Sequence, residues 1–237
     1  MRALLEHLEE ATYARDAAVR QQAEQFFKDL IAYVNVEPDV LARRLKEDRS
    51  GAFSVMARAF TDVGEPTLIV VFAPPNGGRQ GGVGKLGHMD ALVLNVLRAP
   101  GDLGHLATRV QKNVVVHEVT HLLDPGRRQG KQSARAVERG DVAGYYNEPG
   151  EWNAYWQEGA AQLERMLCTF ATPGLAPESR SKAFDFMFGD GSLRALQDRV
   201  GKFWDVDFLD AMDPKTQRKF NKRLADLWTN LHAQGLL

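Results

Sequence analysis

Three side chains within five residues have the types and spacing to hold a metal ion and activate water. His117, Glu118 and His121 form the pattern H-E-x-x-H. Side chains four residues apart lie on one face of a helix, so the two imidazoles could bind one Zn²⁺. Glu118 would lie at the edge of that face, where its carboxylate could take a proton from a metal-activated water. The pattern predicts one zinc ion per chain with Glu118 as general base.

The residues around this motif indicate a buried helix. No residue from Val114 to Leu123 carries a carboxylate, ammonium or guanidinium group except Glu118. Burying polar side chains without partners costs free energy, so their presence in a buried helix favours a bound metal. The alternative is a helix whose polar side chains are solvated or hydrogen-bonded. We expect the helix to begin near Leu103 and to end at Asp124, before a Pro-Gly pair.

This motif and its uncharged surroundings resemble the signature of the zincin metallopeptidases. A catalytic zinc takes three protein ligands and keeps one position open. In the gluzincins the third ligand is a Glu from a downstream helix. The motif Glu151-x-x-Ala154, preceded by Tyr145, Asn147 and Pro149, resembles that of small bacterial and phage members. The resemblance implies Zn²⁺ held by His117, His121 and Glu151, and a peptide or protein substrate.

Other carboxylates remain open as the third ligand. Glu148 lies about one turn before Glu151, and Glu158 lies two turns after it. An aspartate-ligand arrangement would use Asp141. The metzincin arrangement is excluded, because it requires Gly and His where this chain has Asp124 and Arg127.

Further residues near these motifs could assist the chemistry. Tyr145 and Tyr146 could place a phenol near a developing oxyanion, although packing is the commoner role of such aromatics. Asp124 could orient a ligand histidine, or could simply end the helix. The remaining histidines have no partner at ligand spacing and are interpreted as structural or surface residues: His7, His88, His105 and His232.

A glycine-rich stretch, residues 73–87, is predicted to be a loop. Gly81 to Leu86 superficially resembles a phosphate-binding loop, but Arg79 and Leu86 stand where that motif needs Gly and Ser or Thr. Nucleotide binding is therefore excluded. We expect a mobile loop beside the site, acting as a lid.

The elements that must position the motif indicate an α+β fold. The resemblance implies a zincin-like fold with a small twisted sheet, an active-site helix and helical terminal parts. Ala91–Val96 would then be an edge strand that binds substrate by strand addition. Hydrophobic periodicity and turn residues predict helices over 1–35, 38–48, 147–166 and 193–200 and after Asp213-Pro214, strands over 52–60, 67–72 and 90–97, and a linker over 172–179.

We expect three segments: a helical part (1–50), a catalytic core (51–170) and a helical subdomain (171–237) packed on the core.

Composition limits the classes of function. The 237 residues carry a net charge of −1, which argues against nucleic-acid or membrane-surface binding. Cys168 is the only cysteine, so no internal disulfide forms, as expected in a reducing compartment. Neither a signal peptide nor a membrane span is evident, which predicts a cytoplasmic protein, with a phage-encoded origin also compatible. The oligomeric state is not predicted.

The motifs favour a zinc metallopeptidase that hydrolyses peptide bonds. A second hypothesis is a zincin-like interaction or structural protein, for example a phage component, that binds metal without proteolysis. The presence of Glu118 argues against it, because a structural zinc does not need a general base. A third hypothesis is a zinc hydrolase acting on a non-peptide amide.

Overall fold

A computed structural model describes residues 2–47, 54–56, 68–74, 80–86, 89–99, 102–123, 136, 139–171 and 177–236. The chain divides into two compact units. The sheet unit comprises Val19–Asp124, and the helical unit comprises Met1–Ala18 with Pro125–Leu237. The predicted division into three segments stays a prediction.

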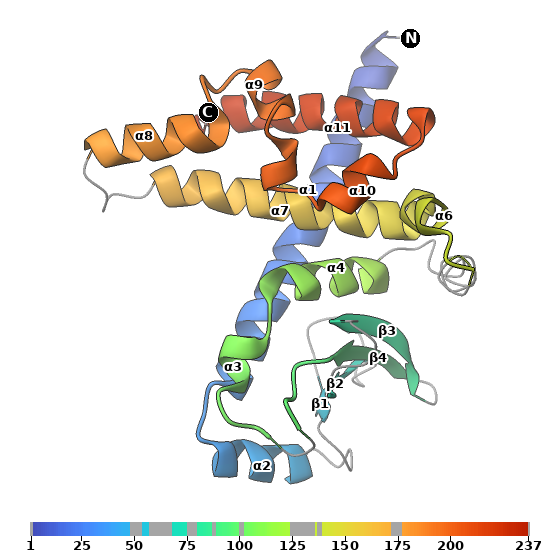
Figure 1. Cartoon of the computed structure of the whole chain (residues 1–237), viewed down its shortest axis with the longest axis vertical. Coiled ribbons are helices and arrows are strands. Elements are labelled where there is room, and N and C mark those ends of the chain that lie inside the picture. Colours follow the sequence, from blue (N-terminus) through green and yellow to red (C-terminus); the bar gives the residue numbers. More distant parts are fainter. Residues whose placement is uncertain are drawn as a thin grey trace. The chain divides into compact units, whose positions relative to one another are not determined.

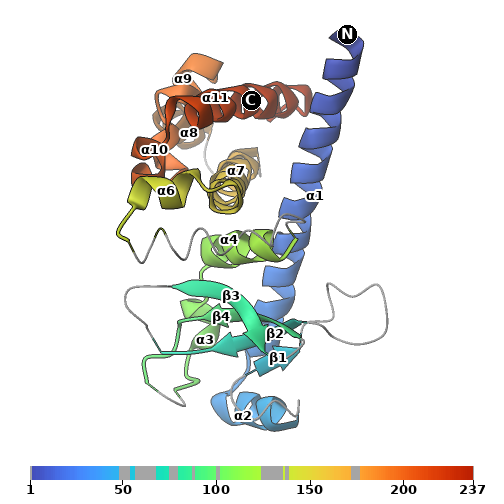
Figure 2. The same cartoon turned by 90° about the vertical axis from the view of Figure 1, so that its right-hand side faces the viewer.

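The sheet unit combines helices with a mixed sheet (Figures 1 and 2). Helix α1 (Arg2–Val34) begins in the helical unit, and its part from Val19 onward belongs to the sheet unit. The other described elements of the sheet unit are α2 (Pro38–Glu47), β1 (Ser54–Met56), β2 (Leu68–Phe72), β3 (Gly81–Leu86), β4 (Met89–Leu94), α3 (Leu106–Arg109) and α4 (Lys112–Leu123). The predicted helices over 1–35 and 38–48 are confirmed, as is the coarse α+β class.

The sheet has the strand order β1-β2-β4-β3. The two inner strands, β2 and β4, are parallel, and Val70 is paired with Leu92. Both of these side chains are fully buried. The outer strands β1 and β3 run antiparallel to their neighbours. Apolar runs without alternation are typical of inner strands such as β2, because both of their faces are covered.

Two predictions about this region are wrong. Gly81–Leu86, expected within a mobile loop, is strand β3, which pairs with β4 along its whole length. Glycine is depleted in strands, which is why composition alone favoured a loop. The expected edge strand, Ala91–Val96, largely coincides with β4, which lies between β2 and β3. Both hydrogen-bonding edges of β4 are therefore occupied, and β3 is the outer strand on that side of the sheet.

The predicted single helix from Leu103 is divided into α3 and α4. Val110 follows α3 with an extended backbone (φ −75°, ψ 113°), so the helix is interrupted before Lys112. The Arg109 guanidinium holds the preceding loop, with its Nη1 3.1 Å from Asp102 Oδ2. At the start of α4, Lys112 forms an ion pair with Glu24 of α1. Helix α4 packs on β3 and β4.

The helical unit is built around a long buried helix, α7. Among the described residues after Pro125, the elements are α6 (Val142–Asn147), α7 (Pro149–Ala171), α8 (Pro177–Phe188), α9 (Leu193–Gln197), the 3₁₀ turn η3 (Val200–Lys202), α10 (Val206–Asp210) and α11 (Pro214–Ala233). Both α9 and α11 begin as predicted: the side chains of Ser192 and Asp213 accept backbone N–H groups of the first turn.

Aromatic side chains form the core of the helical unit. Trp156 of α7 stacks on Trp204 with ring centroids 5.4 Å apart, and both rings contact Phe220 of α11 edge-on. Gly159 lies directly against the Trp204 indole, where a Cβ atom would overlap the ring. The Trp204 Nε1–H donates to the carbonyl of Trp156 at 3.3 Å. These contacts fix α7 within its unit.

Several boundaries in the helical unit differ from the predictions: α7 spans Pro149–Ala171 and α9 ends at Gln197. The expected linker over 172–179 lies partly outside the described residues, and its last part belongs to α8, which begins at Pro177. Asn147, expected as the start of a helix over 147–166, is the last residue of α6. Its side chain donates to the carbonyl of Ala211 at 2.7 Å and accepts from the backbone N–H of Asp213 at 3.1 Å.

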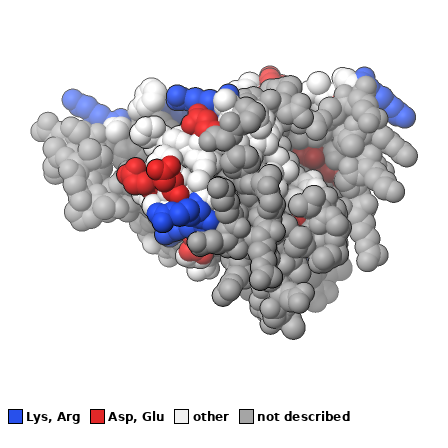
Figure 3. All heavy atoms as spheres, turned by 90° about the horizontal axis from the view of Figure 1, so that it is seen from below, with Lys and Arg blue, Asp and Glu red and all other residues white. Residues whose placement is uncertain are grey.

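Two further observations concern the apolar length of the helices and the distribution of surface charge. Within the described ranges, no helix combines the length and apolar character that crossing a membrane requires. On the face shown in Figure 3, the described basic and acidic side chains lie next to one another and form no patch of a single sign.

Candidate metal centre

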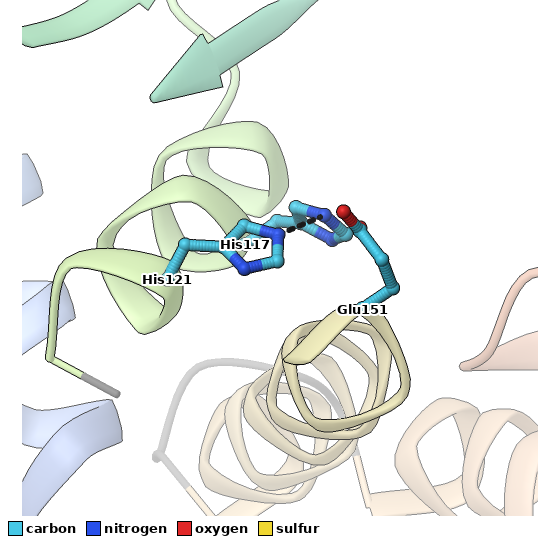
Figure 4. A group of neighbouring side chains, drawn as sticks. All are labelled: His117, His121 and Glu151. Atoms are coloured by element: carbon cyan, nitrogen blue, oxygen red, sulfur yellow. Dashed lines mark hydrogen bonds between the residues drawn. The ribbon is translucent and has the colours of Figure 1, made fainter. Parts of the chain in front are cut away.

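Helix α4 brings the two motif histidines together. His117 and His121 lie one turn apart, and their Nε2 atoms are 3.3 Å apart. The ring planes are inclined by 72°, with centroids separated by 5.0 Å. Figure 4 shows both rings on α4, with the contact between their nitrogens as a dashed line. The spacing expected from the sequence is confirmed: the two imidazoles share one face of the helix.

The separation of these nitrogens matches a tetrahedral metal site. Two nitrogens at the zinc–nitrogen distance, about 2.0–2.1 Å, and at a tetrahedral angle lie roughly 3.3–3.4 Å apart. A hydrogen bond between two imidazoles is also about this long. The distance between the two nitrogens therefore fits both a hydrogen bond and a shared metal ion. His117 and Glu118 are both buried.

Glu118 lies where α4 meets strand β3. A Cβ atom built on Gly81 would lie 3.1 Å from both Cγ and Oε1 of Glu118. The same position would lie 2.8 Å from Cγ1 of Val114, one turn earlier on α4. The carboxylate therefore lies beside the backbone of the outer strand and next to a motif histidine in sequence.

Glu151 belongs to the helical unit, in the first turn of α7. Its side chain is buried within the described chain. His117, His121 and Glu151 each offer one atom of a type that can bind a metal ion. Figure 4 draws the three side chains, the histidines on α4 and Glu151 on α7. Imidazole nitrogens and carboxylate oxygens are both ligand types that zinc accepts in proteins.

Glu148, the nearest rival, is used as a helix cap. Its Oε2 accepts the backbone N–H of Gly150 at 2.9 Å and that of Glu151 at 3.0 Å. Proline is favoured at the first position of a helix, so Pro149 marks residue 148 as the cap. The carboxylate of Glu148 therefore stabilises the start of α7, which carries Glu151.

The other rivals also have local roles. The Asp141 side chain caps α6, with Oδ1 accepting the Gly144 N–H at 2.7 Å, and Asp141 is exposed. Glu158 is half-buried on α7. Its negative charge is one of the influences that raise the pKa of Tyr146.

Tyr145 and Tyr146 belong to an aromatic cluster in the helical unit. Their ring centroids lie 6.4 and 4.9 Å from that of Tyr155 on α7, which stacks on Phe208. Burial raises the pKa of Tyr146, and the charge of Asp205 adds to the effect. Burial also raises the pKa of Tyr155 far above its usual range. These two phenols remain protonated at neutral pH. A catalytic role for Tyr145 or Tyr146 stays a prediction.

The remaining predicted residues fall into two groups. His105 and His232 are exposed, in agreement with a surface role. The His232 ring packs on Trp228, with centroids 4.3 Å apart. Asp124 and His88 lie outside the described residues, as does the side chain of His7.

Comparison of the chain with protein-family models, with curated proteins and with solved structures gives no match. The functional argument therefore rests on the sequence motif and on the geometry of each unit.

Sequence reasoning missed two residues beside the candidate ligands. Glycine content predicts a loop at Gly81, and only its pairing with β4 identifies the strand. Glu148 is an alternative third ligand by sequence, but the following Pro149 is a signal for a helix cap at residue 148.

Proposed function

We propose that this protein is a zinc-dependent metallopeptidase of zincin type, in which His117, His121 and Glu151 hold one Zn²⁺. The observation that carries the proposal is the 3.3 Å separation of the two histidine Nε2 atoms on α4, beside the buried Glu118. In the H-E-x-x-H sequence, His117, Glu118 and His121 follow one another in the order that zinc peptidases use.

The choice of Glu151 as third ligand rests on the roles of its neighbours. Glu148 already accepts two backbone N–H groups at the start of α7, and Asp141 caps α6. Glu151 is buried in the first turn, and a carboxylate is a ligand that zinc accepts together with two imidazoles.

Glu118 would carry the proton in the reaction. As general base its carboxylate takes a proton from the attacking water, and as general acid it passes that proton to the leaving amine nitrogen. Zinc, when bound, supplies Lewis acidity toward the water and the substrate carbonyl. The two tyrosines of α6 are proposed as donors to the developing oxyanion. The single cysteine is compatible with action in the cytoplasm.

The test is hydrolysis of a mixed peptide library by the purified protein, read by mass spectrometry. We expect cleavage that a zinc chelator abolishes and added Zn²⁺ restores, because the metal is needed in every turnover. Cleavage that survives complete removal of metal would contradict the proposal. A zinc-loaded protein that cleaves no peptide would favour the non-proteolytic binding role.

A further inference from the structure

Strand β3 approaches α4 closely at a residue without a side chain. Gly81 is the first residue of β3, and it faces Val114 and Glu118 of α4. These two residues are one turn apart, so they form a stripe on the helix face turned to the strand. A methyl group at Gly81 would meet both side chains at 3.1 Å or less. A Cβ atom added at Gly82 or Gly84, the other described glycines of this strand, would meet no atom within 4 Å.

The backbone at Gly81 cannot easily withdraw from the helix. Gly81 is paired with Leu94 in the ladder between β3 and β4. Just beyond it, the Asn95 N–H donates to the carbonyl of Gln80 at 2.9 Å. Strand β4 is itself paired with β2 on its other edge. A side chain added at Gly81 would therefore have to displace side chains of α4 rather than the strand.

We propose that Gly81 is a positioning residue for Glu118. The bare backbone of β3 forms a wall that limits where the Glu118 carboxylate can lie, and a side chain at Gly81 would move the carboxylate from its place. This inference rests on the proposed function for its catalytic consequence. The contact between Gly81 and Glu118 does not depend on that function and can be tested on the metal-free protein.

The first experiment is a double-mutant cycle in unfolding by urea. It is done in a Val114→Ala background, because a Cβ atom at position 81 would lie only 2.8 Å from Cγ1 of Val114. The alanine removes that atom. There, Gly81→Ala should lower the folding equilibrium constant at least about twofold more with Glu at position 118 than with Glu118→Ala. Equal costs in the two backgrounds would overturn the proposal. If Gly81→Ala prevents folding whichever residue is at 118, close packing and not Glu118 explains the glycine, and the proposal fails.

The second experiment separates positioning from simple packing. In the Val114→Ala background, Gly81→Ala should lower kcat for the best library peptide roughly tenfold or more, with KM little changed, because small displacements of a catalytic group are costly. Gly82→Ala in the same background is the matched control and should leave kcat unchanged. An unchanged kcat in the Gly81 variant would overturn the positioning role. A parent protein without peptidase activity would contradict the proposed function instead, and the unfolding cycle would then decide on Gly81.

Discussion

Glu118→Gln is expected to lower kcat by about 10²–10⁴-fold while zinc remains bound. The amide keeps the shape of the side chain but cannot take a proton from water. Because Glu118 is not proposed as a ligand, removing its charge leaves the donor set of two imidazoles and one carboxylate intact. The measurements are the initial rate on the best library peptide and the zinc content by elemental mass spectrometry.

The control for this variant is Glu37→Gln, which makes the same chemical change at an exposed position. It should behave as wild type in both measurements. Undiminished hydrolysis by Glu118→Gln would show that another group takes the proton. Loss of zinc from the same variant would show that Glu118 holds the metal, and the assignment of base and ligand would have to be revised.

His121→Ala is expected to weaken zinc binding by more than about 100-fold, since losing a direct ligand costs more than losing a supporting hydrogen bond. His117→Ala should have the same effect, because the two Nε2 atoms are proposed to bind the same ion. Competition with a fluorescent zinc chelator measures the affinity. The apoprotein should retain its helix content in circular dichroism, since α4 is also held by the buried Val115, Val116 and Val119.

His232→Ala provides a matched control, because His232 also lies in the last turn of a helix and its ring packs on Trp228. Its zinc affinity should equal that of wild type. If His121→Ala bound zinc as tightly as His232→Ala, the 3.3 Å contact in α4 would be a hydrogen bond between imidazoles and not half of a metal site.

Local sequence signals were sufficient wherever one element decides the geometry. The i, i+4 spacing predicted that His117 and His121 share a helix face, and their nitrogens do converge. Cap residues predicted the starts of α9 and α11, because Ser192 and Asp213 act within a single turn. Both cases depend on contacts between residues at most four positions apart.

Sequence signals failed where pairing across the fold decides the structure. Strand β3 is rich in glycine and has low strand propensity, and its pairing with β4 overrides that propensity. The same pairing moves β4 from the expected edge to the interior of the sheet. The cap formed by the Glu148 carboxylate is hard to predict from sequence, because this role is commoner for shorter side chains.

The most direct test of the central claim is the zinc content of wild type and of Glu151→Ala after equal exposure to Zn²⁺, with Glu148→Ala and Glu158→Ala as controls. We predict about one zinc ion per chain in wild type and in both controls, and loss of zinc in Glu151→Ala. Zinc retained by Glu151→Ala would contradict the assigned third ligand. A wild type that binds no zinc would contradict the metal site itself.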